Sequence, residues 1–273
     1  MTRYQEYMKM VEIADVIVEL RAEGAFIEAM VRDLVADEWT NPTPAEGWTI
    51  AHQVGHLHWT DAVSSLAIDH LHEFNAVRER HACDPDQYVD DAAAVELGTG
   101  PADLLHRWTM HRDALSTRLA ELPPATSIEW FGPPMKPASM ATARLMETWA
   151  HGQDIADALH IEHPAGSALR HIAHLGVRTR NFSFELRGLP APTTEIFVDL
   201  TAPDGSSWQW GPPNAPESVS GQAEDFCLAV TQRRHTADLE LDVRGETAQL
   251  WLSIAQAFAG KATSGRAPSG HSQ

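Results

Sequence analysis

Apolar residues recur at helical spacing through most of the first two thirds of the chain. Positions three or four apart are repeatedly apolar, as in helices that bury one face. The breaks are sharp: two prolines and a glycine fall within residues 41–47, and Pro123 and Pro124 end a later segment. The pattern predicts helices over residues 11–39, 50–68, 101–122, 140–161 and 167–186.

The starts of these helices carry capping signals. Thr49 and Ser139 precede the second and fourth helices, and hydroxyl side chains there accept hydrogen bonds from free amide groups of the first turn. Pro101 stands at the favoured first position of the third helix. Four of the five predicted helices have 18 to 25 residues, and such helices joined by loops are typical of an antiparallel bundle. We therefore expect a mainly α protein, with an up-and-down four-helix bundle over residues 1–188.

The pattern changes after Pro190. Alternating apolar and polar positions predict a strand, a Pro-Asp-Gly turn follows, and a second alternating run predicts the returning strand. The expected elements are strands over residues 194–201 and 207–211, a helix over 221–234, a strand within 237–245 and a helix from 246 to 260. They describe a small α+β domain. We place it at residues 189–262 and expect residues 263–273, which are rich in glycine, serine and proline, to be disordered.

Composition narrows the class of function. Acidic residues outnumber basic ones 38 to 20, and no basic stripe of the kind that binds nucleic acid is present. No run of 18 apolar residues predicts a membrane-spanning helix, and the N-terminus does not resemble a signal peptide. Two distant cysteines predict no disulfide framework and favour the cytoplasm. The chain contains 15 histidines, the commonest metal ligands in proteins, which directs attention to metal chemistry.

One predicted helix places three chemical groups on one face. Glu147, His151 and Asp154 follow one another at spacings of four and three residues, so they line up along the helix. A carboxylate and an imidazole four residues apart can bind one ion together. The spacing alone is equally consistent with an exposed ion pair. A third ligand must come from another helix, where His52, His56 and His58 compete within AHQVGHLHWTD. His52 and His56 share a helix face, whereas His58 points elsewhere.

Two segments resemble a known family. GWTIAHQVGHL, followed about ninety residues later by ARLMETWAHGQDIADAL, is similar to the paired signature of the DinB-like superfamily, and most similar to its mycothiol-dependent maleylpyruvate isomerase branch. The resemblance implies that His56, Glu147 and His151 are the metal ligands. It also implies a divalent metal, commonly zinc, with positions left open for water or substrate. By its position one turn beyond His151, Asp154 could hydrogen-bond a ligand imidazole; a solvated helix carboxylate is the alternative.

The resemblance extends to the C-terminal domain. EDFCLAVTQRR is similar to the family's closing helix, which ends in Gly-Arg; here Gln232 replaces the glycine. Arg233 would match the arginine that reaches the active site and binds substrate or cofactor, although the adjacent Arg234 leaves open which guanidinium points inward. The loop Trp130–Met135 is apolar but broken by prolines. We expect it to cover the metal site, with Trp130 mostly buried and in contact with the cofactor; the alternative is a simple connection between helices.

These observations favour an enzyme. A metal held by three protein ligands with an open position is a catalytic arrangement. The resemblance implies that a low-molecular-weight thiol, such as mycothiol, attacks a small electrophilic molecule, so that the protein is a thiol S-transferase or a cis–trans isomerase. A metal-dependent hydrolase and a metal-binding protein without turnover are the alternatives. The expected partners are the small molecule and the thiol, with no nucleic acid and no membrane; the protein is expected to be a monomer or homodimer.

Overall fold

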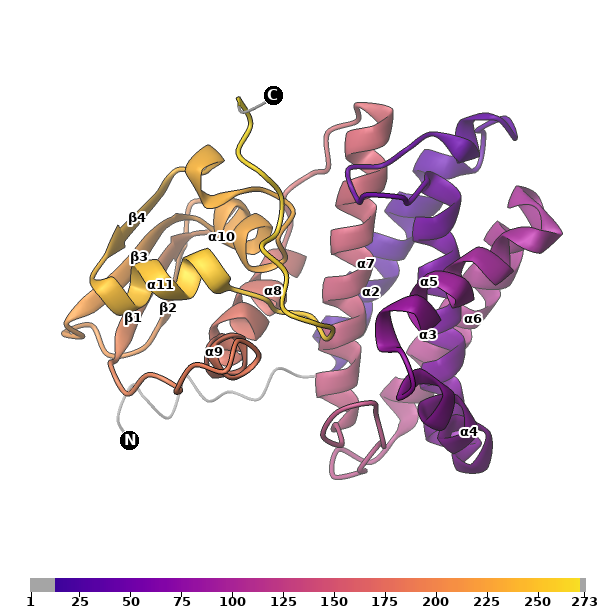
Figure 1. The fold of residues 1–273 in the computed structure, drawn as a ribbon, viewed down its shortest axis with the longest axis horizontal. Helices are drawn as coiled ribbons and strands as arrows, with labels where there is room; N and C mark the ends of the chain where they lie inside the picture. The colour runs from indigo at the N-terminus through magenta and orange to yellow at the C-terminus, as the bar shows by residue number, and fades with distance from the viewer. Residues whose placement is uncertain (1–12, 271–273) are drawn as a thin grey trace. The chain divides into compact units, whose positions relative to one another are not determined.

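The structure is a computed structural model in which residues 13–270 are described. By its contacts the chain divides into two compact units, residues 1–163 and 164–273, which are considered separately. Four long helices form the first unit: α2 (Ile13–Val31), α3 (Ile50–Asp69), α6 (Pro101–Glu121) and α7 (Pro137–Leu159). Both α2 and α3 pack against α6 and α7 (Figure 1). The expected mainly α fold with a small C-terminal α+β region is confirmed.

Shorter elements complete the first unit. The helices α4 (Leu71–His81) and α5 (Pro85–Val95) follow α3 and pack on it, and the 3₁₀ helix η2 (Glu96–Thr99) leads into α6. The first expected helix is shorter than predicted: α2 ends at Val31, and the chain turns before the 3₁₀ helix η1 (Glu38–Thr40).

The two capping predictions had different outcomes. Thr49 is the N-cap of α3, and its backbone amide donates to Nδ1 of His52 at 3.2 Å. His52 is thereby engaged at the start of the helix. The prediction for Ser139 was wrong, because α7 begins at Pro137 after Lys136. Proline fits the first turn of a helix, where its missing amide costs no hydrogen bond.

The core of the bundle is continuous and apolar. Side chains from α2, η1, α3, α6 and α7 are almost completely buried in one cluster: Ile27, Val31, Trp39, Ile50, Val54, Leu57, Leu104, Trp108 and Ile155. Burial of side chains of this size stabilises each by roughly 1.5–3 kcal/mol relative to exposure. This cluster holds α3 in place beside α7.

A buried ion pair crosses from α7 to α3. Nε of Arg144 donates to Asp61 Oδ1 at 2.9 Å, and the indole of Trp108 donates to Asp61 Oδ2 at 3.1 Å. Arg144 and Asp61 are only 2% and 3% exposed. Because an unpaired buried charge is costly, helices shifted by one turn would lose this pair and be strongly disfavoured. The pair therefore sets the register between α3 and α7.

The second unit contains a four-stranded sheet with the order β2-β1-β3-β4 (Figure 1). Its strands are β1 (Ile196–Thr201), β2 (Ser207–Trp210), β3 (Glu217–Gln222) and β4 (Leu241–Arg244). The strands β1 and β3 are parallel, and the two outer pairs are antiparallel. The sequence pattern missed β3 because Val219 is its only large apolar residue. Its place between β1 and β4 supplies partners for its backbone on both sides.

Four helices accompany the sheet: α8 (Ala168–Arg178), α9 (Arg180–Glu185), α10 (Ala223–Val230) and α11 (Glu246–Ile254). The sequence analysis assigned α8 and α9 to the bundle, but they belong to the second compact unit. The reason is the close packing of α8 on α10. A side chain at Gly176 would meet Val230 at 2.8 Å, so only glycine permits this approach.

The described part of the C-terminal segment is hydrogen-bonded to the second unit. The guanidinium of Arg266 donates to the carbonyl of Arg233, and the amide of Ser269 donates to Asp238. Disorder was expected from residue 263 onward, and up to residue 270 these contacts oppose it. Disorder of residues 263–273 stays a prediction.

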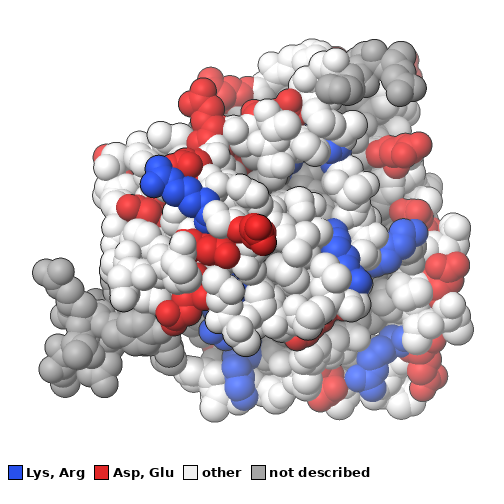
Figure 2. Space-filling model, turned by 60° about the vertical axis from the view of Figure 1, so that its left-hand side comes forward, with Lys and Arg blue, Asp and Glu red and all other residues white. Residues whose placement is uncertain are grey.

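The surface agrees with the acidic composition. On the face shown in Figure 2, lysine and arginine side chains lie scattered among acidic ones and form no continuous patch. Among the described residues, no helix is both long and apolar enough to span a membrane.

The role of the Arg144–Asp61 ion pair in setting the register of α3 and α7 can be tested by mutation. We expect Asp61→Ala to lower the free energy of unfolding by about 3–5 kcal/mol, because Arg144 keeps a buried charge without its carboxylate. Asp69→Ala is the matched control: Asp69 pairs with Arg118 at 2.8 Å near the end of the same helix, but this pair is exposed. Its loss should cost about 1 kcal/mol or less. Equal losses in urea unfolding of the two variants would contradict the assignment.

Candidate metal centre

The packing of α3 on α7 brings three predicted ligands together. Glu147 and His151 lie one turn apart on α7, and His56 faces them from α3. One ligand atom from each residue lies within 4.8 Å of the other two. Glu147 Oε2 is 3.2 Å from Nε2 of His151 and 3.6 Å from Nε2 of His56. The imidazole rings are 4.6 Å apart between centroids.

The donor set suits a divalent cation. His56 and His151 are each 8% exposed, and the Glu147 side chain is 23% exposed, so the cluster is buried but reachable. Burial alone would raise the pKa of the Glu147 carboxyl. Hydrogen bonds and charge interactions with His151 and His56 outweigh burial and hold this pKa well below its usual range. Two imidazoles and an ionised carboxylate are ligands that zinc accepts.

Tryptophan rings enclose the cluster. Trp48 stacks on His151 with centroids 5.9 Å apart and lies 5.3 Å from the ring of His56. Trp59 also lies against His56, with ring centroids 5.9 Å apart. The sequence analysis did not single out either tryptophan. The available signal was their adjacency to the histidine motif, since Trp48 begins the segment and Trp59 follows His58 directly.

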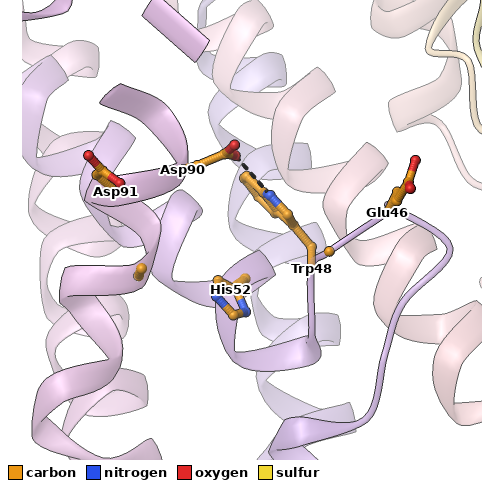
Figure 3. Close-up of a pocket in the computed structure, with 7 residues that line it drawn as sticks. Glu46, Trp48, His52, Asp90 and Asp91 are labelled. Carbon is orange, nitrogen blue, oxygen red and sulfur yellow. Dashed lines mark hydrogen bonds between the residues drawn. The ribbon is translucent and has the colours of Figure 1, made fainter. Parts of the chain in front are cut away.

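A pocket of about 250 Å³ lies on the outer side of Trp48. Figure 3 shows Trp48 reaching toward α5, where its indole donates to Asp90 at 3.0 Å. His52 lines this pocket, as do Glu46 and Asp91. Burial lowers the pKa of the His52 imidazole, although the charge of Asp90 opposes this shift. Trp48 thus forms a wall shared by the metal cluster and the pocket.

Comparison with known proteins assigns the chain to a family. The family described as the mycothiol maleylpyruvate isomerase N-terminal domain matches residues 20–156, which contain all three candidate ligands. The chain belongs to this family. A second family, described as wyosine base formation, matches residues 192–242 in the second unit.

Relatives and solved structures extend this finding. Two uncharacterized proteins of Mycobacterium tuberculosis, from strains CDC 1551 and H37Rv, are each 50% identical over 250 residues, covering 92% of this chain and 97% of theirs. The crystal structure of the mycothiol-dependent maleylpyruvate isomerase and that of its histidine-to-alanine mutant both match with a TM-score of 0.55. At 12–13% identity, over 84% of this chain and 92% of theirs, these structures show a shared fold.

His58 and Asp154 were also considered as members of the site. His58 points away from the cluster and pairs with Glu96 at 2.7 Å. Asp154 is buried, at 1% exposure. At Nδ1 of His151 the structure places Gln53 Oε1, 2.5 Å away. A role for Asp154 in the centre stays a prediction.

The Trp130–Met135 loop lies one aromatic ring away from His56. Phe131 packs on Trp59 with centroids 6.3 Å apart, and Trp59 in turn faces His56. Trp130 stacks on Phe74 of α4 at 5.9 Å and is half-buried, less than expected. Two backbone hydrogen bonds between Ile128 and Met135 close the loop. Contact between Trp130 and a cofactor stays a prediction.

Arg233 lies in the second unit, just after α10. The amide of Arg233 donates to Leu228 and that of Gln232 to Ala229, which is the double hydrogen bond that ends many helices. Gln232 has φ of +58°, a left-handed conformation that favours glycine and costs roughly 1–2 kcal/mol for other residues. This explains the glycine in the family pattern. Here the Gln232 side chain donates to Ala255 at 2.9 Å, which compensates in part.

We expect His151→Ala to remove most of the metal from protein purified without chelator, because a three-ligand site would lose one donor. Wild-type protein should contain close to one divalent ion per chain, measured by elemental analysis. The control is His106→Ala, which removes an exposed histidine of α6. Full occupancy in a variant with His56, Glu147 and His151 all changed to alanine would place the metal elsewhere.

Proposed function

We propose that the protein binds one divalent metal ion, most simply zinc, through His56, Glu147 and His151, and uses a low-molecular-weight thiol to attack an electrophilic small molecule. The observation that carries this proposal is the convergence of two imidazole nitrogens and a carboxylate oxygen within 4.8 Å, in a chain of the mycothiol maleylpyruvate isomerase family. The thiol would be mycothiol or similar. The reaction would be S-transfer or cis–trans isomerisation.

The residues present fit such an ion. Both imidazoles direct Nε2 toward the same carboxylate oxygen, so the three donors share a common centre. Three protein ligands leave a position open for an exogenous ligand. When bound, the metal would act as a Lewis acid and lower the pKa of a thiol that reaches it.

The surrounding side chains support binding and exclusion of water. Trp48 and Trp59 cover the faces of the ligand imidazoles, which limits the water that reaches the centre. Exclusion of water strengthens charge interactions and protects a thiolate from protonation. The pocket beside Trp48 is large enough for part of a small molecule, such as the body of the thiol or of the electrophile.

Arg233 is proposed as a further catalytic residue. Its guanidinium would bind a substrate carboxylate or stabilise negative charge on the adduct, since arginine stays charged and presents paired donors. Addition of the thiol to an unsaturated acid would place negative charge next to such a carboxylate. Elimination of the thiol after bond rotation would give the isomer, and retention of the thiol would give the transfer product.

A hydrolase is the second candidate, because two histidines and one glutamate also hold zinc in hydrolytic enzymes. Thiol dependence separates the two reactions: hydrolysis through a metal-bound hydroxide needs no added thiol.

We expect mycothiol to bind directly at the metal. Protein loaded with Co²⁺ should develop a thiolate-to-cobalt charge-transfer band in the near ultraviolet when mycothiol is added, because the thiol would be deprotonated on binding. His151→Ala protein, treated in the same way, should show no band. Absence of the band in wild-type protein, together with hydrolytic turnover in the absence of thiol, would favour the hydrolase.

Arg233→Ala should reduce mycothiol-dependent turnover of maleylpyruvate by roughly 10²-fold while metal content stays normal, the scale for removing a group that stabilises developing charge. Arg233→Lys should restore little, because lysine lacks the forked donor. Arg234→Ala shows which of the two arginines acts. Arg244→Ala is the control, since this exposed arginine of β4 pairs only with Asp242 among the ion pairs described. Wild-type rates in both the Arg233 and Arg234 variants would exclude a catalytic arginine here.

A further inference from the structure

The side-chain amide of Gln53 lies between a ligand histidine and a fixed backbone group. Gln53 Oε1 is 2.5 Å from Nδ1 of His151, and Gln53 Nε2 is 2.8 Å from the hydroxyl of Thr43. The Thr43 hydroxyl is 2.9 Å from the backbone carbonyl of Trp48. Gln53 is completely buried, and its contact with His151 is buried as well.

The direction of every hydrogen bond in this chain follows from its last member. The carbonyl of Trp48 can only accept, so the Thr43 hydroxyl donates its single proton there. The Thr43 oxygen must then accept from the amide nitrogen of Gln53. This orientation turns the Gln53 carbonyl oxygen toward His151, and an oxygen that accepts requires a proton on Nδ1.

A proton on Nδ1 of neutral His151 leaves the lone pair on Nε2. That nitrogen is the one that faces Glu147, 3.2 Å away. The second ligand histidine differs: Nδ1 of His56 is buried and has no hydrogen-bond partner among the described residues. Among the described residues, an acceptor at Nδ1 is thus found for His151 but not for His56.

We propose that Gln53, itself oriented by Thr43, is the positioning residue that fixes His151 in the Nδ1–H tautomer and aims its Nε2 lone pair at the metal. This inference rests on the metal centre of the proposed function, but not on thiol chemistry. Groups that orient a metal-bound histidine typically contribute 10–100-fold to metal affinity. Gln53 orients His151 as an uncharged hydrogen-bond acceptor.

Competition with a chelator, at fixed neutral pH and without thiol, measures the Zn²⁺ affinity of full-length variants. Gln53→Leu should bind Zn²⁺ about 10–100-fold more weakly, because no acceptor remains at Nδ1. Gln53→Glu should stay close to wild type, since a carboxylate also accepts from Nδ1–H. A packing role alone predicts the reverse order, with leucine tolerated and a buried carboxylate harmful.

A matched control is available on α7. Gln153 is also buried, at 6% exposure, but donates to Asp157 at 2.8 Å instead of contacting a ligand. Gln153→Leu should keep wild-type Zn²⁺ affinity. Should Gln53→Leu fail to fold, Thr43→Val provides the second variant: it removes the group that orients the Gln53 amide and should weaken Zn²⁺ binding in the same direction.

The tautomer itself can be observed without metal. In ¹⁵N NMR spectra of the metal-free protein, Nδ1 of His151 should carry a proton, and Gln53→Leu should abolish this preference. An unprotonated Nδ1 in wild-type protein, or equal Zn²⁺ affinity in wild type and Gln53→Leu, would overturn the role of Gln53. Absence of Zn²⁺ binding in wild-type protein would overturn the metal centre as well. Absence of thiol-dependent turnover with these results intact would refute only the proposed reaction.

Discussion

The packing of α3 against α7 is the interaction on which the rest of the site depends. The two helices contribute His56 on one side and Glu147 with His151 on the other, so no ligand set exists until they meet in one register. Apolar burial brings the helices together but tolerates a shift along their axes. The buried pair of Arg144 and Asp61 does not, because a shift would leave two charges without partners.

The contact between α3 and α7, here called the seam, is polar along much of its length. From the ion pair it passes to the three candidate ligands and then to Gln53, all on facing sides of α3 and α7. Each buried polar group requires a hydrogen-bond partner, and the partners are available only when α3 and α7 pack in one particular geometry. The polar groups that would bind the metal and those that set the register thus belong to one structural feature.

The comparisons establish the family and the fold of the protein, whereas its reaction is a proposal. The first unit carries the family's domain and the candidate ligands, and the fold is shared with a mycothiol-dependent maleylpyruvate isomerase. The second unit shows how this chain departs from the pattern. Gln232 takes the left-handed position of a glycine, and its side chain binds the backbone at Ala255 and the hydroxyl of Thr263. This position therefore anchors the C-terminal segment in addition to ending α10.

The sequence by itself determined the elements whose signals are local. Helical spacing and the Thr49 cap located α3, and the spacing of Glu147 and His151 placed them on one helix face, because such patterns depend only on neighbours along the chain. Resemblance to the family identified His56 among three nearby histidines. Helical spacing placed His58 on a different face but did not distinguish His56 from His52.

Tertiary structure decided what depends on partners distant in sequence. The strand β3 has one large apolar residue and exists because β1 and β4 pair with its backbone. The helix α8 joined the second unit because Gly176 admits Val230. Gln53 became the neighbour of His151, although they are 98 residues apart, because a side-chain amide gives no sequence signal of its hydrogen-bond partner. That partner is set only when α3 and α7 pack in register.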